Sequence, residues 1–162
     1  MYVTTRGKPK KVPVKLCKMA VKWFGKKLLS DRLYHNISVR IEFSNAELGK
    51  IYYAFCEWND TNHRSRDFTI TIDPNLGKTT MLTVLAHEMV HVKQYAAGEL
   101  KDYLKTSRIK YLGNIYEMNN ESEAYWDYPW EIEAAGRERG LYLRFMKFLR
   151  EKKHDNNKIC RS

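Results

Sequence analysis

The sequence predicts a single α+β domain in which helices at both ends flank a small sheet. Apolar side chains recur at helical spacing near the N-terminus, over residues 14–29, and again from residue 79 onwards. Between residues 37 and 72 they alternate with polar side chains, which is the period of a half-buried strand. A chain of 162 residues can bury one core but is short for two domains.

The N-terminal 13 residues are expected to form a flexible basic arm, because residues 4–13 are polar, contain prolines and offer little to bury. The next segment, residues 14–29, predicts a helix with an apolar stripe and with lysines on its other face. We expect this helix to pack on its own domain. The apolar residues of the stripe are Leu16, Met19, Ala20, Trp23, Phe24 and Leu28.

Three strands are expected to follow. Residues 37–43 alternate strictly, residues 51–58 are rich in β-branched and aromatic side chains, and residues 67–72 alternate again. The polar segment 59–66 connects the last two strands, and Asp73-Pro74-Asn75 ends the sheet. Because the strands follow one another at short spacing, we expect a three-stranded antiparallel meander.

Two further helices complete the predicted fold. The first spans about residues 79–97, where an apolar stripe runs up to a stop signal at Gly98. The second begins near Pro129, which suits the first turn of a helix, and continues to about residue 149, although two glycines weaken its middle. Residues 102–120 are rich in tyrosine and give no clear period.

The helix over residues 79–97 carries the candidate chemistry. His87 and His91 are four residues apart, so both imidazoles leave the same face of the helix about one turn from each other. Neutral imidazole is a good zinc ligand, and two on adjacent turns can bind one Zn²⁺ ion. Glu88 follows the first histidine, where its carboxylate can reach a zinc-bound water as general base without binding the metal itself.

The segment His87-Glu88-Met89-Val90-His91 resembles the H-E-x-x-H signature of the zincin metallopeptidases. The resemblance covers roughly residues 35–149 and implies a minimal zincin-like domain, bounded at residues 14–150 and followed by a basic tail over residues 151–162. It also implies a zinc-dependent metallopeptidase that hydrolyses peptide bonds in a protein or peptide substrate. In zincins an edge strand before the site helix aligns the substrate, a role that residues 67–72 would have here.

The third ligand distinguishes the zincin subfamilies. Metzincins need H-E-x-x-H-x-x-G-x-x-H, but Gln94 and Ala97 occupy the glycine and third-histidine positions. Proteases of the SprT and Spartan type take a third histidine a little downstream and often carry a zinc ribbon. This chain is similar to them in size, basic charge and preceding strand, yet it has no histidine between His91 and His154 and no C-x-x-C pair.

The remaining match is the gluzincin-like pattern, which takes a glutamate from a later helix. In such families a small residue follows the glutamate by three positions, and Glu131 with Ala134 matches that spacing. Glu133 is the alternative ligand, but it points about 200° round the helix from Glu131, so the helix can offer only one of the two. Glu121 and Glu123 are weaker rivals, because no helix start precedes them.

A zinc hydrolase also needs a donor for the developing oxyanion and an acceptor that orients the ligating histidines. Tyr95, Tyr125 or Tyr128 could supply a phenol, and His63 lies in the loop before the third strand. Since the chain has 11 tyrosines, most of them must be packing residues, and the sequence does not choose among these four candidates. It indicates no particular acceptor.

Positive charge is concentrated at the two ends of the chain, whose net charge is +10. Residues 1–30 contain nine lysines and arginines and no acid, and residues 137–162 contain nine against three acids. Such ends would attract a polyanion, so nucleic acid is a candidate partner. The alternative functions are therefore a non-catalytic zinc-containing module and a basic nucleic-acid-binding module.

The remaining features concern the cellular compartment. No apolar run approaches the roughly 20 residues that span a bilayer, so no membrane association is expected, and no apolar stretch of a secretory signal follows the first basic residues. Cys17, Cys56 and Cys160 are far apart and odd in number, which argues against a disulfide framework and indicates idle thiols. We therefore expect a cytoplasmic protein.

Overall fold

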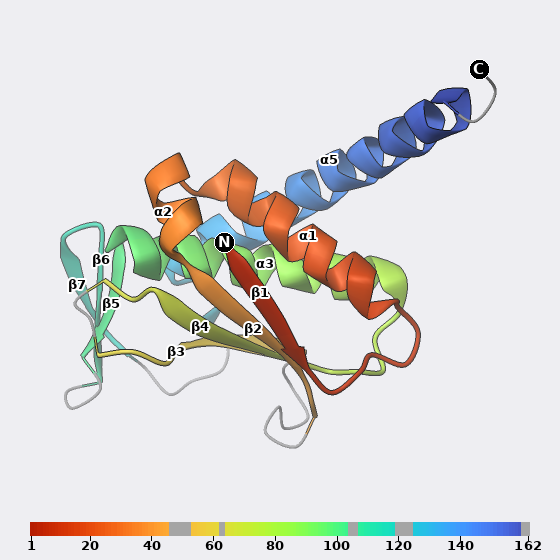
Figure 1. Ribbon diagram of the computed structural model, residues 1–162. Helices are drawn as coiled ribbons and strands as arrows, with labels where there is room; N and C mark the ends of the chain where they lie inside the picture. The colour runs from red at the N-terminus through yellow and green to blue at the C-terminus, as the bar shows by residue number, and fades with distance from the viewer. Residues whose placement is uncertain (46–52, 62–63, 104–106, 119–124, 160–162) are drawn as a thin grey trace.

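The structure is a computed structural model that describes residues 1–45, 53–61, 64–103, 107–118 and 125–159. Helices α1 (Val14–Leu28) and α3 (Lys78–Ala97) cover one face of a four-stranded sheet, and α5 (Pro129–Ile159) projects away from the body (Figure 1). The expected mixture of helices and sheet is confirmed. Within the described ranges, no helix is both long and apolar enough to pass through a lipid bilayer.

Four strands form the main sheet: β1 (Tyr2–Arg6), β2 (Ser38–Phe43), β3 (Ala54–Trp58) and β4 (Asp67–Ile72). Their order in space is β1-β2-β4-β3, so β4 has neighbours on both sides. β1, β2 and β4 run parallel, and β3 is antiparallel to β4. Every residue of β4 after the first is buried, as expected for a strand in the interior of a sheet.

The expected three-stranded antiparallel meander is wrong. β4 inserts between β2 and β3 and is parallel to β2, so β2 and β3, which follow one another in the sequence, are not neighbours in the sheet. The edge strand on this side of the sheet is therefore β3, not residues 67–72 as expected. Spacing along the chain does not determine pairing, because a connection can cross over a strand that is added later.

The expected flexible arm over residues 1–13 is wrong for its first half. Residues Tyr2–Arg6 form β1, which adds a parallel strand beside β2. The backbone N–H of Tyr2 donates to the carbonyl of Ile37 at 3.0 Å, and Val3 is buried. The β-branched residues at the centre of this segment favour a strand, which outweighs the polar character of the segment as a whole.

The helices predicted over residues 14–29 and 79–97 are confirmed by α1 and α3. A short helix, α2 (Asp31–Asn36), lies between α1 and β2 and is absent from the sequence prediction; its N-cap is Ser30, whose hydroxyl accepts from Leu33 N at 3.4 Å. The core fills the space between the main sheet and the helices α1 and α3. Its fully buried side chains include Phe24, Ile41, Phe68, Ile70, Leu82, Leu85 and Met89.

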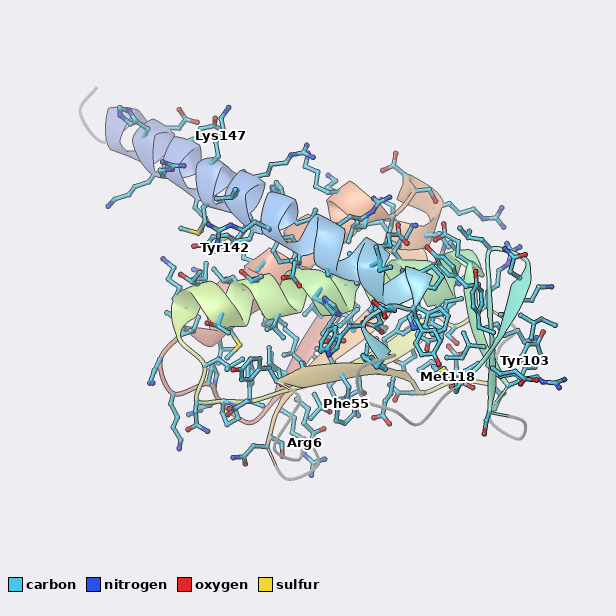
Figure 2. The ribbon with its side chains drawn as sticks, turned by 180° about the vertical axis from the view of Figure 1, so that it is seen from behind. Arg6, Phe55, Tyr103, Met118, Tyr142 and Lys147 are labelled. Atoms are coloured by element: carbon cyan, nitrogen blue, oxygen red, sulfur yellow. The ribbon has the colours of Figure 1, made fainter. Side chains whose placement is uncertain are left out.

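α5 begins at Pro129, as predicted, but it continues to Ile159. The segment expected to be a basic tail after residue 150 is therefore helical up to that point. Phe145 anchors the helix, because its ring lies 5.6 Å from the ring of Trp23 and 5.5 Å from that of Phe24. Phe148 and Leu149 also pack against the core, and the C-terminal part of the helix projects from the body of the molecule (Figure 2).

The two basic ends of the sequence meet where α1 packs against α5. The rings of Trp23 and Phe148 lie 6.1 Å apart. Lys27 Nζ is 5.4 Å from the ring centroid of Trp23, and Lys152 Nζ is 6.0 Å from that of Phe148. Cation–π attraction at these two rings offsets part of the repulsion between the lysines.

A second sheet occupies the tyrosine-rich region to which the sequence gives no assignment. Its strands β5 (Leu100–Tyr103), β6 (Arg108–Tyr111) and β7 (Asn114–Glu117) are antiparallel and follow one another in sequence order. Leu112 and Gly113 join β6 to β7 with φ values of 47° and 96°, the two positive values of a type I′ hairpin turn. The strands have four residues each, which is too short for a period of two to be recognised.

α3 ends at Gly98, as predicted, and the turn there leads directly into β5. Gly98 adopts the left-handed conformation with φ of 75°. Its N–H donates to the carbonyl of Tyr95 at 3.0 Å, and the N–H of Glu99 donates to the carbonyl of Gln94 at 2.8 Å. These two bonds form a Schellman motif, which satisfies carbonyls that the helix end would otherwise leave free.

Replacing Gly98 with alanine is expected to lower the free energy of unfolding by about 1 kcal/mol or more, because an L side chain is strained at this φ. The new Cβ would also lie 2.9 Å from Arg64 Nε. Denaturant titration measures the change. The control is Gly140→Ala in α5, where a Cβ meets no atom of the described chain within 4 Å, and it should be neutral or slightly stabilising. Equal losses in both variants would contradict this explanation.

Candidate metal centre

One face of α3 carries a row of side chains at intervals of four residues. They line a cavity of about 820 Å³, and they are Thr79, Thr83, His87, His91 and Tyr95. Residues four apart lie on the same side of a helix, about 6 Å further along its axis at each step. The opposite side of α3 is packed in the core, so the rotation of the helix is fixed and these side chains point toward the cavity.

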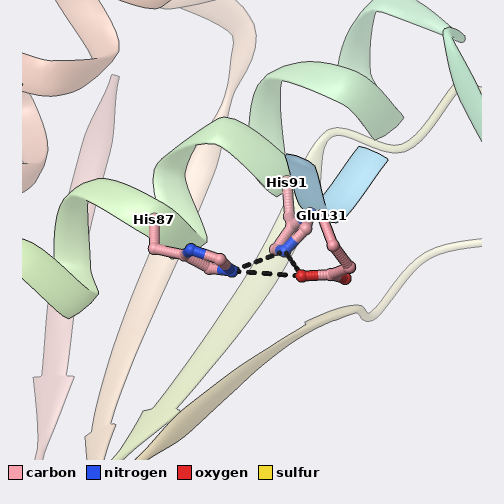
Figure 3. Close-up of side chains that lie close together, drawn as sticks. All are labelled: His87, His91 and Glu131. Carbon is pink, nitrogen blue, oxygen red and sulfur yellow. Dashed lines mark hydrogen bonds and ion pairs between the residues drawn. The ribbon is translucent and has the colours of Figure 1, made fainter. Parts of the chain in front are cut away.

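Three side chains with metal-binding atoms meet in this cavity (Figure 3). Nε2 of His87 lies 3.1 Å from Nε2 of His91. Glu131, in the first turn of α5, places Oε2 3.3 Å from His87 Nε2 and 3.4 Å from His91 Nε2. His87, His91 and Glu131 are thus brought together as a group that could hold a metal ion. They are the three residues that the sequence indicates as ligands.

Gln94 fixes the tautomer of His91. The amide nitrogen of Gln94 donates to the carbonyl of Trp130 at 3.0 Å and to Glu133 Oε2 at 2.8 Å, and both of these oxygens can only accept. The amide oxygen therefore faces His91 Nδ1, at 2.9 Å, and Nδ1 must be the donor. In a neutral imidazole the proton is then on Nδ1, so Nε2 presents a lone pair to the other ligand atoms.

Glu138 fixes His87 in the same way, because its Oε2 accepts a hydrogen bond from His87 Nδ1 at 2.9 Å. Two Nε2 lone pairs and the carboxylate of Glu131 then face one another. Glu131 Oε2 is buried and makes no hydrogen bond within the described structure, since the two Nε2 atoms lie at ion-pair distance without hydrogen-bond geometry. Converging lone pairs repel unless positive charge lies between them, so these residues fit a metal ion.

Protons compete with a metal ion for the same position. Burial alone would lower the pKa of His87, but its contacts with Glu131 and Glu138 outweigh burial and raise that pKa to about 10. Burial alone would raise the pKa of Glu131, but the two histidines and a hydrogen bond from Tyr125 lower it to about 2. The carboxylate is therefore ionised at neutral pH, and the cluster attracts either a proton or a metal cation.

Glu88 lies beside the ligand group without belonging to it. It is 5% exposed, and it lines the same cavity as the two histidines. Burial raises its pKa, and the positive charge of His91 and His87 opposes that rise. A buried carboxylate at the wall of a cavity, next to a metal-binding group, is suited to exchange protons with a bound molecule.

Glu133, the alternative third ligand, lies outside the ligand group. Its Oε2 accepts from Gln94 and from the hydroxyl of Tyr111 at 2.9 Å, and its Oε1 lies 3.1 Å from Lys93 Nζ. Burial would raise the pKa of Glu133, but these three partners lower it overall. Glu133 therefore holds Gln94 in place and acts on His91 through it.

The four candidates for oxyanion stabilisation differ in where the structure places them. Tyr95 and Tyr125 line the cavity, and Tyr125 contributes to the lowered pKa of Glu131. Tyr128 instead donates from its hydroxyl to the backbone carbonyl of Glu117 at 3.2 Å, at the small sheet. Four residues considered in the sequence lie outside the described ranges: His63, Glu121, Glu123 and Cys160.

Two residues of the site are absent from the sequence prediction, namely Gln94 and Glu138. Each accepts a hydrogen bond from the Nδ1 of one histidine. The spacing contains a usable signal, because Glu138 follows Glu131 by seven residues, which is two turns along the same face of a helix. In the structure, the carboxylate in that position reaches Nδ1 of His87.

Removing the carboxylate of Glu138 is expected to weaken metal binding by roughly 10–100-fold, because His87 then loses the hydrogen bond that fixes its ring and tautomer. The variant is Glu138→Ala, and the measurement is a competition titration against a chelating dye. Glu151→Ala is the control, since Glu151 is an exposed residue of the same helix, 3.8 Å from Lys147. Equal affinity of the two variants for metal would contradict the role of Glu138.

Metal affinity is also expected to rise with pH. With its pKa raised to about 10, His87 holds a proton at neutral pH that must leave when a metal ion binds. Release of one proton would strengthen the apparent affinity about tenfold for each pH unit between about pH 6 and pH 8. The same dye titration at several pH values measures this slope, and an affinity independent of pH would exclude proton competition.

The donor set is typical of a catalytic rather than a structural metal site. It consists of two imidazole nitrogens and one carboxylate oxygen, and its open side faces the cavity. Of the two cysteines in the described residues, Cys17 is buried in the core, and Cys56 lines the cavity from β3. Comparison with protein-family models, with curated proteins and with solved structures finds no match for this chain.

Proposed function

We propose that this protein is a zinc-dependent peptidase of the zincin type. Its ligands would be His87, His91 and Glu131, and Glu88 would be the general base. The observation that carries the proposal is the convergence of three lone-pair atoms on the wall of a cavity, with a fourth, non-ligating carboxylate beside them. Two nitrogens, one oxygen and an open position are the ligand set that catalytic zinc sites use.

When bound in such a site, zinc lowers the pKa of a water molecule and polarises the carbonyl of the substrate. Glu88 accepts a proton from the attacking water as its oxygen forms a bond with the carbonyl carbon. The same carboxylic acid then gives that proton to the amide nitrogen when the carbon–nitrogen bond breaks. The products are a carboxylic acid and an amine, and Glu88 returns to its starting state.

The edge strand β3 is suited to hold an extended peptide in the cavity. One side of β3 pairs with β4, and residues Ala54–Cys56 line the cavity from this strand. Backbone groups on the other side of an edge strand can pair with a peptide, which then lies across the mouth of the site. Such pairing recognises the peptide backbone and leaves side-chain preference to the pockets along the cavity.

The alternative of a non-catalytic zinc module differs from this proposal in what it requires of Glu88. A structural site uses four protein ligands and has no need of a buried acid that is not a ligand. Burial of Glu88 without coordination costs free energy and is understandable if the carboxylate takes part in a reaction. This consideration favours the enzyme over the module.

The deciding variant is Glu88→Gln, which keeps the shape of the side chain but cannot accept the proton. We expect it to bind one zinc ion per chain, as the wild type does, and to lose cleavage by about 100-fold or more. Metal analysis and hydrolysis of an unfolded, fluorescently labelled protein measure the two properties, with Glu151→Gln as control. Zinc-loaded wild type that cleaves nothing, or Glu88→Gln that cleaves normally, would overturn the proposal.

A further inference from the structure

The small sheet forms one end of the cavity, and its register decides which side chains face it. Leu100 pairs with Tyr111, and Asp102 pairs with Ile109, so these four residues share one face of the sheet. Leu100, Ile109 and Tyr111 are buried against Trp130. Asp102 therefore places a carboxylate on a face made of apolar and aromatic residues.

This face of the sheet opens into the metal-binding cavity. Asp102, Ile109 and Met118 all line it, together with the metal ligands. Met118 lies on the inner side of the small sheet, whereas Tyr103, which follows Asp102 on the opposite face of β5, lies at the outer edge of the molecule (Figure 2). One continuous cavity thus contains the metal ligands at one position and an acid within an apolar wall at another.

Tyr95 connects the two positions. It lies one turn after His91 on the face of α3 that lines the cavity. Burial raises its pKa, and the negative charges of both Asp102 and Glu131 raise it further, so both carboxylates act on the same phenol. Because Tyr95, Asp102 and the metal ligands line one cavity, a peptide bound with its scissile bond at the metal ligands can place a nearby side chain beside Asp102.

Asp102 lacks a cationic partner in the part of the chain that the structure describes. No lysine, arginine or histidine nitrogen of that part lies within 4.0 Å of its carboxylate. Burial raises its pKa, and no compensating contact opposes the shift. A partly buried carboxylate without a partner has a free-energy cost that a cationic ligand would remove.

We propose that Asp102 and the apolar residues around it form a substrate subsite for a lysine or arginine side chain. The methylene stem of such a side chain packs against Leu100, Ile109 and Met118, and its cationic end pairs with the carboxylate. This inference rests on the proposed peptidase function and adds the substrate class to it. The substrates are peptides with a basic residue close to the scissile bond.

The first experiment uses zinc-loaded wild-type protein and a mixture of synthetic peptides of random sequence, with the cleavage sites identified by mass spectrometry. We expect lysine and arginine to be enriched at one position relative to the cleaved bond. If no peptide is cleaved, the peptidase function fails and the subsite with it. If peptides are cleaved without a basic preference, the peptidase function stands and the subsite is overturned.

The second experiment assigns the preference to Asp102. Two peptides that differ only by lysine or methionine at the preferred position give a ratio of kcat/KM values. Asp102→Asn should lower that ratio by about tenfold or more, because a charge-assisted contact is lost. In Asp102→Lys the ratio should fall further, and a peptide with glutamate at that position should be cleaved better than the one with lysine.

The matched control is Glu117→Gln, which removes one negative charge from the exposed side of the same small sheet. It should leave the ratio within about twofold of the wild-type value, since exposed charges contribute little. If Asp102→Lys does not fold, the nearly isosteric Asp102→Asn still tests whether Asp102 causes the lysine preference. A lysine preference that persists in Asp102→Asn, or that Glu117→Gln lowers equally, overturns the role of Asp102.

Discussion

The packing of α3 against the first turns of α5 is the contact on which the candidate metal centre depends. It brings Glu131 to histidines that precede it by about 40 residues in the sequence. Ala134, one turn after Glu131, is fully buried, and its small side chain lets the two helices approach closely. A larger residue there would hold the carboxylate away from the imidazoles, so the candidate metal centre depends on close helix packing as well as on its own residues.

Gln94 stands at the centre of this contact and shows how the packing orients the ligands. Its side chain is fully buried and bonded on one side to His91 and on the other to Trp130 and Glu133. A buried amide with all of its groups paired tolerates only one orientation, because any rotation leaves a donor or an acceptor without a partner. The orientation of His91 is thus set by the packing of α5 before any ion binds.

Local patterns in the sequence predict α1, α3, the start of α5 and the three candidate ligands, since each of these patterns lies within a few residues. The four-residue spacing of His87 and His91 and the Glu131–Ala134 spacing are of this kind, and Gly98 ends α3 as its position indicates. Strand order is different, because β4 is added between β2 and β3 through contacts that no single segment contains. Gln94 and Glu138 act across two helices, so their roles become visible only when both helices are in place.

The candidate ligands His91 and Glu131 enclose a long segment of the chain, and this matters for its folding. The segment between His91 and Glu131 contains the whole small sheet, together with the end of the cavity that carries Asp102. An ion held by both ends of that segment would act as a crosslink that closes a long loop and removes conformational freedom from the unfolded chain. The protein would then complete the wall of its own cavity and become resistant to unfolding in the same event that makes it chemically competent.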